Sequence, residues 1–169
     1  MVRAMNPHTP PIQFADIELP SMQLSSGLAA FVVNEVPLYE PCGEGPHTYV
    51  RIEKMGLTTR DAITVVADRA GVRARDVGTA GQKDKFARTT QWMSLPPGAK
   101  EFTAGEQLSD SLQILDVSHH GNKLRTGHLK GNGFELTFDV DDAALPEIRQ
   151  VMDRIASEGM RNYYGPVEG

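Results

Sequence analysis

A single stretch of the chain, from Gly78 to Trp92, constrains the fold most strongly. Glycines punctuate its first half, which favours a loop, and threonines and an aromatic residue in its second half favour a strand. The loop carries one carboxylate, Asp84, between Lys83 and Lys85. Because opposite charges nearby favour the ionised form of an acid, we expect Asp84 to be an anion in a field that attracts phosphate. From spacing alone, a solvated Lys-Asp-Lys turn explains the same residues.

Length and composition favour one ordinary globular domain. The chain has 169 residues, 40% of them hydrophobic and 23% charged, which is enough to bury a core. No apolar run approaches the roughly 18 residues that span a bilayer, and the N-terminal residues lack the apolar core of a secretion signal. One cysteine, Cys42, cannot form an internal disulfide. We therefore expect a cytoplasmic protein with no membrane segment.

The net charge of −5 argues mildly against nucleic-acid binding, but the charges are unevenly distributed. Bases gather around the glycine-rich stretches 82–91 and 119–132, whereas acids predominate from Glu135 onward. A cationic face on an acidic body can attract a polyanion. Solvated surface charge explains the clusters equally well.

The pattern of strands and helices predicts an α+β domain. Proline-rich residues 1–30 indicate a loosely ordered arm. Alternating or β-branched segments predict strands over 31–36, 47–54, 89–95, 112–117 and 134–140. A Thr58–Asp61 capping box opens a helix that Gly71 ends, and Asp141–Asp142 cap a second helix that ends at Gly159. Because neighbouring strands are not separated by helices in strict alternation, we expect a largely antiparallel or mixed sheet with both helices packed on it.

A second basic stretch, from Lys123 to Phe134, combines glycines with a candidate base-binding pair. Glycine lets the backbone approach a ligand closely. Asn132 offers both a donor and an acceptor to the edge of a uracil, and Phe134 could stack on a base. A glycine turn that leads into a strand, with Phe134 in the core, is the alternative.

Both stretches resemble the motifs of the TruD family of tRNA pseudouridine synthases. Ala80-Gly81-Gln82-Lys83-Asp84-Lys85, with Gln91-Trp92 after it, resembles the run that holds the family's catalytic aspartate. The Lys-Leu-Arg run at 123–125 and Lys-Gly-Asn-x-Phe at 130–134 resemble its second motif. The resemblance implies that Asp84 is catalytic and that Asn132 and Phe134 hold the target uridine.

The resemblance extends from about Phe31 to Gly165, where Asn162-Tyr163-Tyr164-Gly165 resembles a third family motif. We therefore expect a partial pseudouridine synthase catalytic domain over 31–165 and a tail over 166–169. The chain departs from the family at Ser25–Phe31, where a lysine and Pro-Glu-Asp-Phe are usual, and after Gly165. Family members are about twice as long, which implies that an inserted domain and the rest of the catalytic sheet are missing partners.

The family reaction implies isomerisation of uridine to pseudouridine in the D-arm of tRNA, without a cofactor. Basic side chains near the two motifs are candidates to contact backbone phosphates, which position RNA without specifying its sequence. They are Lys83, Lys85, Arg88, Lys123, Arg125 and Lys130.

Other kinds of site lack the necessary residues. His119 and His120 with one cysteine do not make a zinc cluster, so we expect no metal, and no phosphate-loop motif or nucleophile elbow is present. Two alternatives to an active enzyme stay open. The chain could be a truncated, non-catalytic fragment that binds RNA or a protein, or a truncation that self-associates through an uncovered sheet edge.

Overall fold

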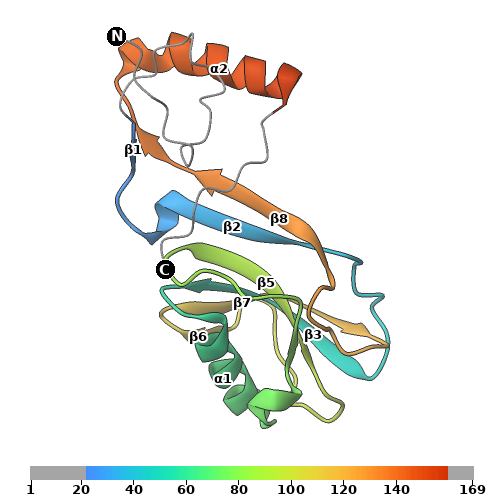
Figure 1. Cartoon of the computed structure of the whole chain (residues 1–169). Coiled ribbons are helices and arrows are strands. Elements are labelled where there is room, and N and C mark those ends of the chain that lie inside the picture. Colours follow the sequence, from blue (N-terminus) through green and yellow to red (C-terminus); the bar gives the residue numbers. More distant parts are fainter. Residues whose placement is uncertain (1–21, 160–169) are drawn as a thin grey trace, which may run out of the picture. The chain divides into compact units, whose positions relative to one another are not determined.

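The computed structural model describes residues 22–159 and divides the chain into two compact units. The larger unit comprises residues 24–137, and the smaller one comprises the residues before and after it. The described part of the smaller unit holds a two-stranded sheet of β1 and β9, a short 3₁₀ helix and α2. Figure 1 labels the main elements and colours the chain along its sequence. Their bounds are β1 (Gln23–Leu24), η1 (Leu28–Ala30), β2 (Phe31–Pro37), β3 (His47–Met55), α1 (Thr59–Ala70), η2 (Ala74–Asp76), β4 (Gly78–Thr79), β5 (Arg88–Leu95), β6 (Gln107–Ser109), β7 (Leu112–His120), β8 (Leu129–Leu136), β9 (Phe138–Asp139), η3 (Asp142–Ala144) and α2 (Leu145–Glu158).

A seven-stranded mixed sheet forms the larger unit. Its strand order is β6-β7-β3-β5-β2-β8, and β4 pairs with β5 beyond the end of the β2 pairing. The pairing of β2 with β5 is parallel, with Val33 opposite Thr89, and the other pairings are antiparallel. The mixed sheet and two main helices confirm the predicted α+β class.

Helix α1 covers one face of this sheet (Figure 1). The predicted capping box is present, because Thr58 accepts a hydrogen bond from the backbone N–H of Asp61 while the Asp61 carboxylate accepts one from the N–H of Thr58. Gly71 ends the helix with φ 71°, the left-handed conformation that favours glycine. The buried stripe of α1 packs on apolar side chains of β3, β5 and β7. The core comprises Ala62, Val66, Ala67, Ala70, Val50, Ile52, Val77, Met93, Leu95, Phe102, Leu112 and Ile114.

A smaller cluster lies on the opposite face of the sheet. Adjacent residues of a strand point to opposite faces, so Trp92 lies on this side while Met93 enters the α1 core. Trp92 packs with Tyr49, Ala80 and Leu124, which confirms the prediction that it is a core residue. This cluster joins the segment after β4 and the segment after β7 to the sheet.

Two predicted boundaries differ from the structure. Strand β8 begins at Leu129, within the stretch that the sequence indicated as a glycine-rich loop, and ends at Leu136. Its glycines lie opposite β2, with Gly133 facing Asn34, so ladder pairing with β2 outweighs the weak strand preference of glycine. Asp141 caps η3 rather than α2, which begins at Leu145.

The domain limits 31–165 stay a prediction. Residues 1–21, the third motif at 162–165 and the tail at 166–169 lie outside the described residues. In the described part of the 1–30 arm, β1 and η1 are short ordered elements. Helix α2 belongs to the smaller unit, where Val151 is its buried apolar residue.

Gly78 provides a test of how tightly the segment after β7 packs on β4. A Cβ at position 78 would clash with the Leu124 carbonyl oxygen and lie 2.5 Å from Ser94 Oγ. We expect Gly78→Ala to lower the free energy of unfolding by about 1–3 kcal/mol because the core cannot absorb the methyl group without shifting. Urea unfolding measures this, with Gly121→Ala as control, since a Cβ there meets nothing within 4 Å. Equal losses of unfolding free energy in the two variants would contradict this prediction.

Candidate active site

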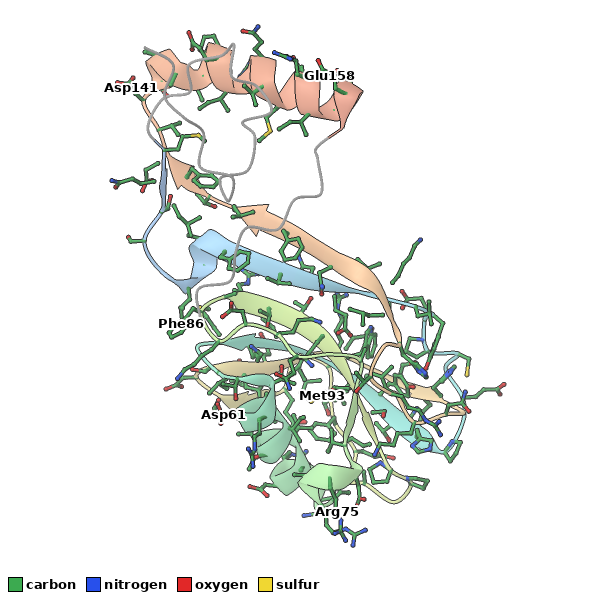
Figure 2. All side chains as sticks on the ribbon, viewed as in Figure 1. Asp61, Arg75, Phe86, Met93, Asp141 and Glu158 are labelled. Atoms are coloured by element: carbon green, nitrogen blue, oxygen red, sulfur yellow. The ribbon has the colours of Figure 1, made fainter. Side chains whose placement is uncertain are left out.

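Asp84 lies at the surface, on the loop of residues 80–87 that connects β4 to β5. Its Oδ1 accepts a hydrogen bond of 2.8 Å from the backbone N–H of Phe86, which holds the carboxylate in a local turn. Phe86 is 72% exposed and points away from the packed interior, whereas Met93 lies inside it (Figure 2). Lys85 extends over the Phe86 ring, with Nζ 5.9 Å from the centroid. The tip of the loop therefore presents a carboxylate, a cation and an aromatic ring to solvent.

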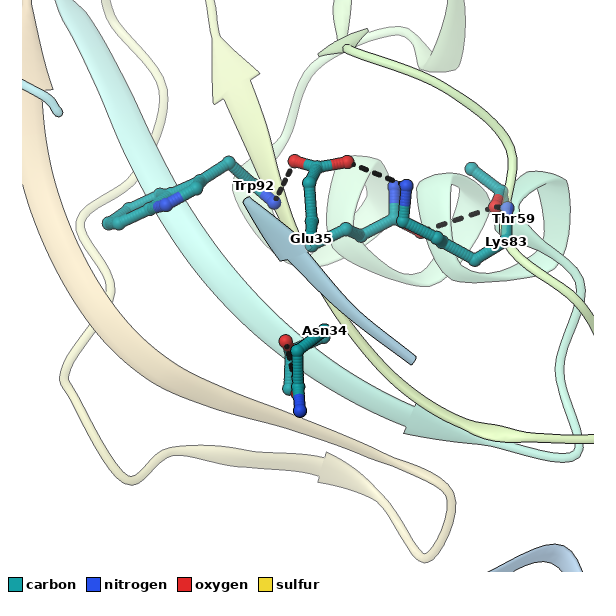
Figure 3. A network of polar contacts seen from close by, with 7 residues as sticks. Asn34, Glu35, Thr59, Lys83 and Trp92 are labelled. Atoms are coloured by element: carbon teal, nitrogen blue, oxygen red, sulfur yellow. Dashed lines mark hydrogen bonds and ion pairs between the residues drawn. The ribbon is translucent and has the colours of Figure 1, made fainter. Parts of the chain in front are cut away.

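The inner side of this loop is fixed by a buried ion pair between Lys83 and Glu35 (Figure 3). Lys83 Nζ lies 2.8 Å from Glu35 Oε2, and both side chains are almost fully buried. The other carboxylate oxygen, Oε1, accepts a hydrogen bond from the backbone N–H of Trp92. The ion pair thus links the Asp84 loop to β2 and β5.

A hydrogen-bonded chain adds a second anchor at the start of α1. The backbone N–H of Lys83 donates to Thr59 Oγ1 at 2.8 Å, and Thr59 Oγ1 donates to Gln91 Oε1 at 3.2 Å. The prediction that Lys83 contacts a phosphate is wrong for this structure, because its ammonium group is paired with Glu35 inside the fold. Lys83 positions the loop instead.

Lys54 holds the main chain at Asp84 itself. Its side chain is fully buried, and its ammonium group donates hydrogen bonds of 2.7 Å to the carbonyl oxygens of Leu57 and Asp84. Burial lowers the pKa of Lys54 from 10.5 to about 8, and the Lys83 charge adds to this, while Asp84 and Asp61 oppose it. A buried cation therefore pins the backbone of the proposed catalytic residue from beneath.

Asn132 and Phe134 project to the sheet face from which Glu35 reaches Lys83. In the antiparallel pairing of β2 with β8, Glu35 lies opposite Asn132 and Val33 lies opposite Phe134, and directly opposed residues share a face. Asn132 is exposed. Phe134 is 59% exposed and stacks on Phe31, with ring centroids 6.2 Å apart, so it is not the core residue of the alternative interpretation.

The other predicted phosphate contacts lie in three different settings. Lys85 and Lys130 are exposed. Arg88 is at the first residue of β5, where it forms a 2.9 Å ion pair with Glu53, so its charge is partly offset. Lys123 and Arg125 lie on the segment after β7, where they line a cavity together with His47.

Two residues that position the loop, Glu35 and Lys54, were not among the predicted site residues. The signal that could have identified them is their position in the alternation of inward-facing and outward-facing residues along each strand. In β2, Glu35 follows Val33 on the side that points inward, and in β3, Lys54 follows Val50 and Ile52 on the apolar side. A charged residue in a buried alternation is costly unless it is paired, which makes such a position informative.

Within residues 22–159, no three His, Cys, Asp or Glu side chains gather in a way that could hold a metal ion. No helix of that described part has the length and apolar character needed to cross a membrane.

Comparison with solved structures defines the class of this fold. The chain superimposes on the crystal structure of a Methanosarcina mazei protein described by the name tRNA pseudouridine synthase D (TruD). The TM-score is 0.71 and the identity 25%, over 89% of this chain and 35% of the other. The mixed sheet with its surface aspartate loop is thus a pseudouridine synthase-like fold.

Sequence comparison identifies the family. A family model described as tRNA pseudouridine synthase D (TruD) matches residues 18–166. Curated relatives with that name are 46% identical in Anaeromyxobacter dehalogenans and 42% identical in Thermus thermophilus, each over 80% of this chain. The chain belongs to the TruD family of tRNA pseudouridine synthases. It spans 38% of the length of these two relatives.

The Glu35–Lys83 pair makes a stability prediction with a matched control. We expect Glu35→Gln to lower the free energy of unfolding by about 3–5 kcal/mol, because it leaves the Lys83 ammonium group buried without its counter-ion. Glu53→Gln breaks the partly exposed pair with Arg88 and should cost about 0–1 kcal/mol. Chemical denaturation measures both values, and similar losses in the two variants would show that Glu35 is not a structural anchor.

The lowered pKa of Lys54 makes a prediction about pH. Between about pH 8 and pH 10.5, the unfolded chain keeps a proton that native Lys54 has released. The free energy of unfolding therefore rises with pH in this window, by at most about 1.4 kcal/mol per pH unit, and this contribution is lost as the pH falls through 8. Urea unfolding should show the rise in the wild type and not in Lys54→Met.

The experiment needs an upper limit of about pH 10 and a control. Burial raises the pKa of Tyr49 above its usual 10.0, so ionisation of that residue in the unfolded chain lowers stability at higher pH. Lys100→Met, at an exposed lysine, should keep the wild-type profile. A wild-type profile in Lys54→Met would assign the pH dependence to another group.

Proposed function

We propose that this chain supplies the catalytic aspartate of an enzyme that isomerises uridine to pseudouridine in tRNA. Membership of the TruD family supports the reaction. The observation that carries the assignment of Asp84 is its environment. The carboxylate is exposed at the loop tip, while Lys54 and the Glu35–Lys83 pair fix the same loop from inside. A preorganised anion at the surface is what a reaction on a bound nucleotide requires.

The reaction balances in atoms and electrons without a cofactor. The bond between N1 of uracil and C1′ of ribose breaks, the uracil turns while it is held, and C5 bonds to C1′. The proton on C5 is lost and N1 gains a proton, so nothing is oxidised or reduced. Asp84 serves either as the nucleophile at the sugar or as the base that removes a sugar proton.

Asn132 and Phe134 are the proposed contacts to the target base. The nucleotide must leave its helix, at a cost of a few kcal/mol. Stacking on the exposed Phe134 ring offsets about 1–3 kcal/mol of this cost, and the Asn132 amide suits the edge of uracil. Lys85 follows Asp84 directly in the sequence and Lys130 precedes Asn132 by two residues, and both are exposed, so we propose them as phosphate contacts near the reacting nucleotide.

The proposed partners are tRNA, in the cytoplasm, and the remaining part of the family's catalytic domain. Strand β8 is the last strand in the order of the described sheet, and its side chains Phe134 and Leu136 are exposed. An uncovered edge strand with exposed apolar side chains favours pairing with a further strand, which supports the second partner.

Replacement of the aspartate tests the function directly. We expect Asp84→Asn to abolish pseudouridine formation and to leave the affinity for tRNA unchanged, because the amide keeps the shape of the side chain but provides neither the anion nor the base. A chimera supplies the full-length setting: this chain replaces the matching segment of the Thermus thermophilus relative. Tritium release from a tRNA transcript labelled at C5 of uridine measures turnover.

Asp110→Asn, in the exposed turn between β6 and β7, is the matched control and should keep wild-type turnover. Turnover by the Asp84→Asn chimera would disprove the assignment. The same assay on the 169-residue chain separates an active segment from a non-catalytic RNA-binding fragment. Tritium release would make this segment sufficient for catalysis, and binding without release would make it an RNA-binding fragment.

A further inference from the structure

A cavity of about 460 Å³ lies in the larger unit, at the end of the sheet where β3 begins and β5 ends. Among its lining side chains are two histidines, a lysine, an arginine and an asparagine, and none of the lining residues within 22–159 is a carboxylate. The lining residues are His47, Gly121, Asn122, Lys123, Arg125 and His128. Such a concentration of donors and positive charge suits an anion.

The segment that forms this cavity is fixed from beneath. Leu124 is buried in the cluster with Trp92, and its backbone N–H donates to Ser94 Oγ at 2.9 Å. The buried Tyr49 hydroxyl donates to the carbonyl oxygen of Asn122 at 2.9 Å. Because Leu124 points into the core, the bases on either side of it in sequence stay at the cavity wall.

The two histidines are also held in place. His47 Nδ1 donates to the carbonyl oxygen of Leu95 at 3.1 Å, since a carbonyl can only accept. His128 Nδ1 lies 2.8 Å from the Tyr39 hydroxyl. Both rings therefore have fixed orientations in the cavity wall, and binding an anion there requires little further ordering of side chains.

This cavity is physically linked to the Asp84 loop. The backbone N–H of Gly127 donates to the carbonyl oxygen of Ala80 at 2.8 Å, and a Cβ at Gly81 would lie 3.9 Å from Leu129. The segment with the basic residues and the loop with the aspartate thus pack on one another. An anion bound in the cavity would have a defined position relative to Asp84.

We propose that this cavity is a phosphate subsite that binds one backbone phosphodiester of the RNA substrate and so sets the register of the RNA relative to Asp84. The proposal rests on the proposed function for the identity of the RNA. Arg125 provides the planar fork that matches phosphate oxygens, Lys123 adds a point charge, and the Asn122 amide and the histidine rings complete the wall. The volume admits a phosphate together with part of its nucleoside.

The salt dependence of RNA binding by the 169-residue chain tests the subsite. Each phosphate contact contributes about 0.7–0.9 to the slope of log affinity against log salt concentration. We expect Arg125→Gln and, separately, Lys123→Gln to lower the slope for an unmodified tRNA transcript by about that amount. Lys100→Gln removes an exposed lysine that does not line the cavity and should leave the slope unchanged.

Three outcomes would overturn the proposal. They are a wild-type slope in both cavity variants, an equal loss in Lys100→Gln, and no measurable binding of the transcript by the wild-type chain. Circular dichroism should show the same thermal transition in all variants, because Arg125 is exposed and the fold of the segment depends on Leu124.

An experiment with inorganic phosphate shows whether the anion that the cavity binds is a phosphodiester of RNA or free phosphate. We expect phosphate, in place of chloride at equal ionic strength, to shift the amide NMR signals of Gly121 and Asn122 weakly and to compete with RNA. Shifts that disappear in Arg125→Gln while the RNA slope stays that of the wild type would mean that the cavity takes free phosphate and not RNA.

Failure of this subsite can be told apart from failure of the proposed function. If Asp84→Asn abolishes turnover but Arg125→Gln keeps the wild-type slope, the function stands and the subsite does not. If Arg125→Gln lowers the slope but Asp84→Asn turns over uridine, the subsite stands and the catalytic assignment fails.

Discussion

The structure around Asp84 depends on the ion pair between Glu35 and Lys83. A buried ion pair is a poor source of net stability, because desolvation of the two charges consumes most of their attraction. Its value here is positional. Glu35 also accepts a hydrogen bond from the backbone of Trp92, so one carboxylate fixes the loop against both β2 and β5. The parallel pairing of these strands stops near this point, and the side chain of Glu35 takes over the role of a ladder hydrogen bond.

Lys54 complements the ion pair from the β3 side of the loop. Its ammonium group donates hydrogen bonds to two carbonyl oxygens and is not paired with a carboxylate of the described residues. Burial therefore lowers the pKa of Lys54. Two buried lysines thus hold the main chain on either side of the peptide that carries Asp84, while the Asp84 side chain stays outside. This division explains how a surface loop can keep a carboxylate in a fixed place.

Much of the fold could be predicted from local sequence rules, and much of the site could not. The capping box at Thr58 and the glycine stop at Gly71 are local signals, and both were correct. The Lys-Asp-Lys run led to the interpretation of two equivalent surface lysines, yet Lys83 points inward and Lys85 outward. That difference depends on Glu35, which lies far away in sequence and approaches only when β2 pairs with β5. The predicted start of β8 was wrong for the same reason, because the pairing of β8 with β2 decides where the strand begins.

The positions of the basic residues also explain how an acidic chain can suit an RNA partner. Some of the cations are paired with carboxylates in the fold, Lys83 with the buried Glu35 and Arg88 with the partly exposed Glu53, so a count of bases in the sequence overstates the charge that RNA would meet. Lys123 and Arg125 line the cavity, and none of the described residues that line it with them is a carboxylate. Because screening confines surface fields to about 10 Å at moderate ionic strength, the local set of charges matters more for a bound phosphate than the net charge of −5. Affinity for a polyanion is therefore set by where the packed segment after β7 holds its bases.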